Sequence, residues 1–245
     1  PDGDDTAADD TGTGPTGTTV ADIQTHVVAT GETVTLEGVV ITSPISARNF
    51  GFFIADKAGG PNSGIWVYAP FVEGLEVTEG QEITITGVVG EYAPGTDDGG
   101  DTGESEAPEL ADTETQTQLR ITSAEEVVVT GAADLPAPST IDSTVLLDAT
   151  AAEAYEGVLV NIETALVTSP YSSGTFQVDD GTIVDSLFMR LDAVRLGDSF
   201  SSIQGLVYFQ DGAYKLEPRA ETDLIGRTDS CGSCSADACI GDLAA

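Results

Sequence analysis

Two short runs of the sequence carry aromatic side chains that could stack on a planar ligand. They are residues 50–56 (FGFFIAD) and residues 63–69 (SGIWVYA). Rings on neighbouring strands bind nucleobases or sugars in this way. The candidate ligand face consists of Phe52, Trp66, Tyr68 and Arg48. Because side chains alternate between the two faces of a strand, some of these rings must pack in a core, and core packing is the favoured interpretation.

An acidic insertion at residues 93–117 could bind a hard cation such as Ca²⁺, which takes about six to eight oxygen ligands. The candidate ligands are Asp97, Asp98, Asp101 and Glu104. Their spacing does not match the EF-hand loop, so a solvated acidic loop is the favoured interpretation. No other cofactor is expected.

The cysteines lie together near the end of the chain, as Cys231, Cys234 and Cys239. Three thiolates without a fourth ligand make a poor zinc site, so we expect one disulfide and one remaining thiol. That thiol either links to another chain or pairs with a cysteine outside this sequence. The single histidine, His26, has no G-x-S-x-G nucleophile motif to act with. We therefore expect no catalytic residues and no enzymatic activity.

The charge balance excludes several kinds of partner. The chain has 42 acidic and 8 basic residues, which gives a net charge of −34. A phosphate backbone and an anionic lipid surface both require clustered Lys and Arg, so nucleic acid is an unfavoured partner. No run of about 18 apolar residues is present, and we expect no membrane insertion. The acidic excess indicates either a salt-rich setting or cation binding, and surface solvation is favoured.

Residues 1–19 contain only Pro, Asp, Gly, Thr and Ala, which cannot bury apolar area and are typical of a solvated spacer. The chain starts at Pro1 without Met, which suggests a processed product. A Thr-rich acidic spacer and a local cluster of cysteines are typical of an exported protein. We expect an extracellular or cell-surface location.

The elements that must position the aromatic runs are β-strands, and they occur twice. Residues 37–40 (EGVV) and 156–159 (EGVL) correspond, as do residues 41–44 (ITSP) and 167–170 (VTSP). The later strands of each half follow in the same order, which predicts two copies of a five-stranded unit. A short helix is expected over residues 143–153 in the connector.

The fold class is therefore all-β, with two tandem five-stranded OB-fold-like barrels. The strand count and the glycines within the long strands favour this fold over one immunoglobulin-like sandwich per half. The expected organisation is a spacer or assembly arm (1–19), domain 1 (20–131), a connector (132–152), domain 2 (153–227) and a cysteine-containing tail (228–245).

The runs VTLEGVVITS, FGFFIAD, GIWVYA and GQEITITGVVGEY resemble the OB-fold modules attached to secreted bacterial nucleases and related surface proteins. The tail CGSCSADACIGDL is similar to a short segment that precedes lamin-tail domains in acidic secreted proteins. In that family the OB-fold modules are accessory parts, so the resemblance implies no catalytic residues for this chain, and we expect it to differ from the family by having no nuclease domain.

Two functions follow as expectations. The first is a secreted structural or adhesive protein that self-associates into a filament. In it, the arm residues Thr16, Thr18, Thr19 and Val20 would add to an open strand edge of a neighbour. The alternative is a ligand-binding accessory module for an oligonucleotide or a glycan, whose ligand the sequence does not identify.

Overall fold

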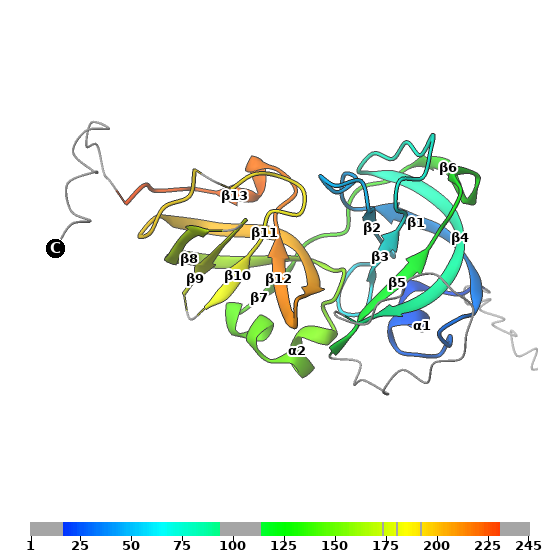
Figure 1. Ribbon diagram of the computed structural model, residues 1–245, viewed down its shortest axis with the longest axis horizontal. Coiled ribbons are helices and arrows are strands. Elements are labelled where there is room, and N and C mark those ends of the chain that lie inside the picture. The colour runs from blue at the N-terminus through cyan, green and yellow to red at the C-terminus, as the bar shows by residue number, and fades with distance from the viewer. Residues whose placement is uncertain (1–16, 94–113, 173, 180, 192, 231–245) are drawn as a thin grey trace, which may run out of the picture.

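The computed structural model describes residues 17–93, 114–172, 174–179, 181–191 and 193–230. Strands dominate this part of the chain, and they form two sheets that lie side by side (Figure 1). The predicted all-β class is confirmed. Within the described residues, none of the helices has the length and apolarity needed to cross a membrane.

Sheet A contains the strands of the first half, in the order β1-β2-β3-β5-β4-β6, and β1 pairs with β4 as well. Its strands are β1 (Thr33–Ile41), β2 (Gly51–Ala55), β3 (Gly64–Tyr68), β4 (Gln81–Tyr92), β5 (Gln116–Arg120) and β6 (Val127–Ala132). A short helix, α1 (Val20–Gln24), precedes the sheet, and the 3-10 turn η2 (Ala124–Glu126) precedes β6.

Sheet B contains the strands of the second half. They are β7 (Ser139–Ile141), β8 (Leu159–Ser172), β9 (Thr175–Val178), β10 (Thr182–Val184), β11 (Ser199–Gln210), β12 (Ala213–Glu217) and β13 (Leu224–Ile225). Pairing runs from β8 through β9, β10, β12 and β11 and returns to β8, which closes a five-stranded barrel. The expected connector helix is present as η3 (Ser143–Leu147) and α2 (Ala149–Glu153), and η4 (Glu221–Asp223) precedes β13.

The glycines predicted to bend the first strand of each half act differently in the two sheets. Gly38 has a φ of +70° and lies where the register of β1 shifts against β4, so it forms a bulge that curves the strand. Gly157 lies before β8 instead of within it, and its N–H donates to the carbonyl oxygen of Val207. The predicted first strand of the second half, β8, therefore begins at Leu159, after most of the EGVL run that corresponds to residues 37–40.

The predicted assembly arm ends in a helix cap instead of a free strand. Thr19 is the N-cap of α1 and forms a capping box with Asp22, in which each side chain accepts a hydrogen bond from the other residue's backbone N–H. Val20 is fully buried in the core of sheet A. Thr18 directly precedes the cap, and Thr16 lies outside the described residues. Thr19 and Val20 are thus not available for pairing with a neighbour, because the cap and the core hold them.

Each sheet encloses its own apolar core, and a third apolar cluster joins the two sheets. Phe53 and Trp66 of sheet A pack there against Leu159 and Leu206 of sheet B. The partly buried members of this cluster are Tyr68, Leu187, Phe188 and Tyr208. The outer face of β2 and β3 is therefore an interface within the chain.

Candidate functional site

The register of β2 and β3 decides which aromatic side chains point away from the core. Phe53 pairs with Trp66, and their ring centroids are 4.8 Å apart. Phe52, one residue earlier, pairs with Val67 and lies in the core of sheet A. Because side chains alternate along each strand, Phe53, Trp66 and Tyr68 share the outer face.

Phe52 was predicted for the ligand face, and its placement there is wrong. Its side chain is fully buried among the aliphatic residues of sheet A. The alternation of the strand shows that Phe52 and Phe53 face opposite ways, and burial under the curved sheet selects Phe52 for the core.

Replacing Phe52 by Leu is expected to cost about 1 kcal/mol of folding free energy, because a smaller side chain leaves the core less well filled. Chemical denaturation measures this loss. Ligand binding by the folded variant is expected to match that of the original chain. A large loss of binding without a loss of stability would place Phe52 at the ligand after all.

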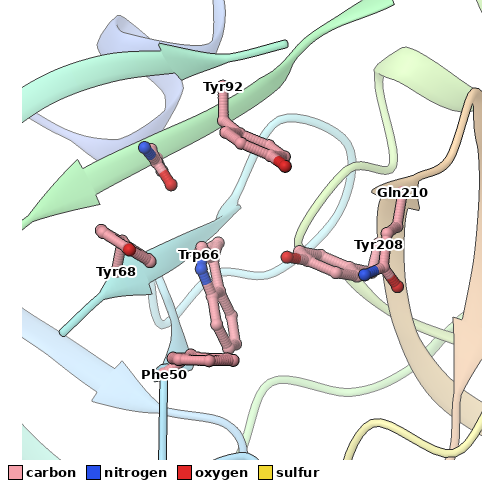
Figure 2. Close-up of a pocket in the computed structure, with 7 residues that line it drawn as sticks. Phe50, Trp66, Tyr68, Tyr92, Tyr208 and Gln210 are labelled. Carbon is pink, nitrogen blue, oxygen red and sulfur yellow. The ribbon is translucent and has the colours of Figure 1, made fainter. Parts of the chain in front are cut away.

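A pocket of about 270 Å³ lies where the outer face of sheet A meets β11 of sheet B. Figure 2 shows Phe50, Trp66 and Tyr68 on one side of it, Tyr208 and Gln210 on the other, and Tyr92 above. The lining residues are Phe50, Trp66, Tyr68, Tyr92, Gln118, Tyr208 and Gln210. Each sheet contributes part of the lining, so neither sheet forms this pocket alone.

The polar groups of the pocket are amides and hydroxyls. The Gln118 side chain is buried and its amide lines the pocket. Burial raises the pKa of Tyr208, and the carboxylate of Glu217 raises it further, so this hydroxyl stays protonated and can donate. The Arg120 guanidinium carbon lies 5.8 Å from the centre of the Tyr68 ring, a cation–π contact that orients the ring.

A second compartment of about 630 Å³ continues from the pocket and shares Phe50, Trp66, Tyr208 and Gln210 with it. Lys215 lies there, 2.9 Å from an oxygen of Asp185 and 3.2 Å from an oxygen of Asp211. Burial lowers the pKa of Lys215, but its hydrogen bonds to the two carboxylates outweigh that effect and raise it. The positive charge of Lys215 in this compartment is therefore neutralised by Asp185 and Asp211.

The four residues of the predicted ligand face are thus divided. Trp66 and Tyr68 line the pocket, Arg48 is exposed at the second compartment, and Phe52 lies in the core. Sequence reasoning missed Tyr92, Gln118, Tyr208 and Gln210. Tyr208 stands in the repeat of the second half, and only the docking of that half against β3 brings it to Trp66, with 5.3 Å between ring centroids.

Backbone contacts fix how the two sheets meet beside the pocket. Gly64 and Gly157 approach so closely that a Cβ on either one would overlap the backbone of the other. Gln24 Nε2 donates to the carbonyl oxygen of Gly64 (2.6 Å) in its own half and to that of Glu156 (3.4 Å) in the other half. The Phe209 N–H donates to Gln116 Oε1 (2.9 Å) across the same contact. These contacts hold the two sheets in close contact beside the pocket.

Glu156 is a fully buried carboxyl group at the same contact between the two sheets. Its Oε1 accepts a hydrogen bond from the Thr117 N–H (2.9 Å), while Oε2 has no partner within the described residues. Burial raises the pKa of Glu156 well above its usual range, and the nearby carboxylates of Glu153 and Glu91 add to this. The protonated form of Glu156 is therefore favoured in this buried contact between the two sheets.

The other predicted sites are not placed by the structure. Asp97, Asp98, Asp101 and Glu104 lie outside the described residues, as do Cys231, Cys234 and Cys239. Among the residues that the structure describes, no group of three or more His, Cys, Asp or Glu side chains is arranged to hold a metal ion. Calcium binding by the acidic insertion stays a prediction.

Comparisons with known proteins add little. No family model and no curated protein matches the chain. Among solved structures it is similar to the Ifi202 HINa domain in complex with a 20-base-pair double-stranded DNA, with 14% identity and a TM-score of 0.30 over 78% of this chain and 93% of that one. It is also similar to the single-stranded DNA binding protein of Thermus aquaticus, with 13% identity and a TM-score of 0.23 over 78% of this chain and 92% of that one. At these TM-scores neither similarity bears on the function of this chain.

Proposed function

We propose that the protein is a non-enzymatic binding module whose pocket between the two sheets takes a sugar ring of a neutral glycan. The observation that carries this proposal is the lining of the pocket. It consists of five aromatic rings and two amides, and none of the described lining residues is charged. Aromatic rings stack on the apolar face of a pyranose, while amides and hydroxyls exchange hydrogen bonds with its hydroxyl groups.

A glycan is favoured over an oligonucleotide by the distribution of charge. The whole chain carries −34, and Lys215 beside the pocket is already paired with Asp185 and Asp211. Arg48 at the second compartment and Arg120 beside Tyr68 would have to neutralise the phosphates of a bound strand, whereas strand binding usually needs a positively charged groove. A neutral sugar avoids this cost.

We also infer that sheet A is organised as an OB-fold-like unit of the same kind as sheet B. In support, β3 runs parallel to β5, as β10 runs parallel to β12, and β1 pairs with both β2 and β4. The equivalence of these pairings supports the internal repeat. In such folds the face of the second and third strands is the common ligand face.

Self-association into a filament and a location outside the cell stay predictions. The described part of the arm gives the filament no support, since Thr19 caps α1 and Val20 lies in a core.

A glycan array followed by calorimetry tests the proposed function. We expect binding of neutral glycans that changes little between about 50 mM and about 500 mM NaCl, because no counterions are released. Replacing Tyr92 by Ala should weaken that binding about tenfold, since one wall of the pocket is lost.

Tyr92→Phe is the matched control, because it keeps the ring and should bind within about twofold of the original chain. Tight binding of a single-stranded oligonucleotide that weakens steeply with salt would contradict the proposal. So would equal glycan binding by the Ala variant and the original chain.

A further inference from the structure

An exposed pair of aromatic side chains lies at the mouth of the pocket. Phe71 is 68% exposed, and its ring centroid is 5.3 Å from that of Phe50, with the ring planes at 74°. Phe50 is itself 36% exposed and lines both the pocket and the second compartment. Figure 2 shows Phe50 beside Trp66. The aromatic surface therefore continues out of the pocket onto the surface of the protein.

The outward position of Phe71 is not explained by packing. The loop between β3 and β4 turns Val72, Leu75 and Val77 towards the core of sheet A, yet leaves Phe71 in solvent. An apolar ring of this size gains about 1.5–3 kcal/mol when it is buried, and Phe71 forgoes most of that stabilisation. Phe71 therefore differs from the other apolar residues of its loop, and its ring contact is with Phe50 at the mouth of the pocket.

The backbone holds Phe71 in an unfavourable conformation. Its φ is +54°, which is a left-handed conformation that bulky residues rarely adopt. The Phe71 N–H donates to the carbonyl oxygen of Asn49 (3.1 Å), so the loop that carries Phe50 fixes this conformation. Such strain costs about 1–3 kcal/mol and is concentrated at binding sites. Exposure and strain together indicate that the ring is placed for a ligand.

We propose that Phe50 and Phe71 form an external stacking site that extends the pocket, so that the protein binds a linear chain of sugar rings. This inference rests on the proposed function. The pocket of about 270 Å³ is at the small end of ligand sites and suits one ring, while the next ring along the chain meets the external pair. A β-1,4-linked pyranose chain fits best, because it is extended and presents flat apolar faces to successive aromatic rings.

The probes for this inference are the monomers, dimers and hexamers of β-1,4-linked glucose and N-acetylglucosamine, titrated by calorimetry into the full chain. The hexamer should bind about tenfold more tightly than the monomer, because it reaches both the pocket and the external pair. Phe71→Asn should lose that gain and keep the affinity for the monomer. Because Asn tolerates a left-handed backbone, the variant should also unfold at the same temperature or a higher one.

Leu196→Ala is the control, since Leu196 is also a strongly exposed apolar residue but lines neither compartment. It should keep the full preference for the hexamer. If Phe71→Asn binds the hexamer as the original chain does, the external site is contradicted, although the pocket stands. If Tyr92→Ala binds the monomer and the hexamer as well as the original chain does, the proposed function fails. Binding of none of these sugars contradicts the inference of a β-1,4-linked chain, and binding of no neutral glycan on the array contradicts both proposals.

Discussion

Gly64→Ala is expected to force the two sheets apart. A Cβ at this position would lie 2.0 Å from the carbonyl oxygen of Gly157 and 2.6 Å from the nitrogen of Val158. Both contacts are with backbone atoms, which cannot rotate away as the end of a side chain can. We expect a loss of about 3 kcal/mol or more in the free energy of unfolding, measured by chemical denaturation. Glycan binding should fall with it, because the pocket needs both sheets.

Gly131→Ala is the matched control, because Gly131 also lies in a strand of sheet A and a Cβ there has no neighbour within 4 Å. It should change stability by less than about 1 kcal/mol. The Gly157 side of the same contact gives a second variant and control. Gly157→Ala places a Cβ in the close contact at a residue with a φ of +72°. Gly212→Ala is its control, because Gly212 has a similar φ of +78° but open space around it. If Gly64→Ala and Gly131→Ala were equally stable, the close approach of the two sheets would be refuted.

Glu156→Gln is expected to stabilise the protein at neutral pH. In the folded chain burial raises the pKa of Glu156 far above the value of about 4.5 that applies when the chain is unfolded. The folded state therefore keeps a proton that the unfolded state releases. Below about pH 4.5 the carboxyl group is protonated in both states and does not affect the free energy of unfolding. That free energy falls as the pH rises from about 4.5 towards the pKa of the folded state.

One such group changes the free energy of unfolding by at most about 1.4 kcal/mol per pH unit. Glu156→Gln removes the contribution of Glu156 to this slope, because an amide does not ionise. Denaturation curves between about pH 4 and pH 8 measure the effect. Burial raises the pKa of Glu217 as well, so a smaller slope of the same sign should remain in the variant. Glu37→Gln, at an exposed position of β1, should leave the slope as it is. An unchanged slope in Glu156→Gln would show that Glu156 is not held protonated in the fold.

Much of the fold could be predicted from local pattern. The alternation and β-branched residues of residues 33–43 predict β1, and the repeat carries the same strand order into the second half. The conformation of Gly157 could not be predicted in this way. Gly157 lies in an EGV pattern like that of Gly38, but its place is set by contact with Gly64, which is 93 residues earlier in the chain.

The site was harder to predict than the fold. Alternation shows that Phe52 and Phe53 face opposite ways, yet it does not say which face is covered. The aromatic content of strands 2 and 3 pointed to Trp66 and Tyr68, and these do line the pocket. Gln118 and Tyr208 join them only because two distant parts of the chain dock, and docking leaves no periodic signal in a sequence.

The position of Trp66 has a practical consequence. It is the only tryptophan of the chain, and it lies 2% exposed between the two sheets with the Tyr208 ring 5.3 Å away. Indole emission shifts to longer wavelength when water reaches the ring. Intrinsic fluorescence of the unmodified protein therefore reports from one known place, and both a bound sugar and a separation of the sheets would change it without any added dye.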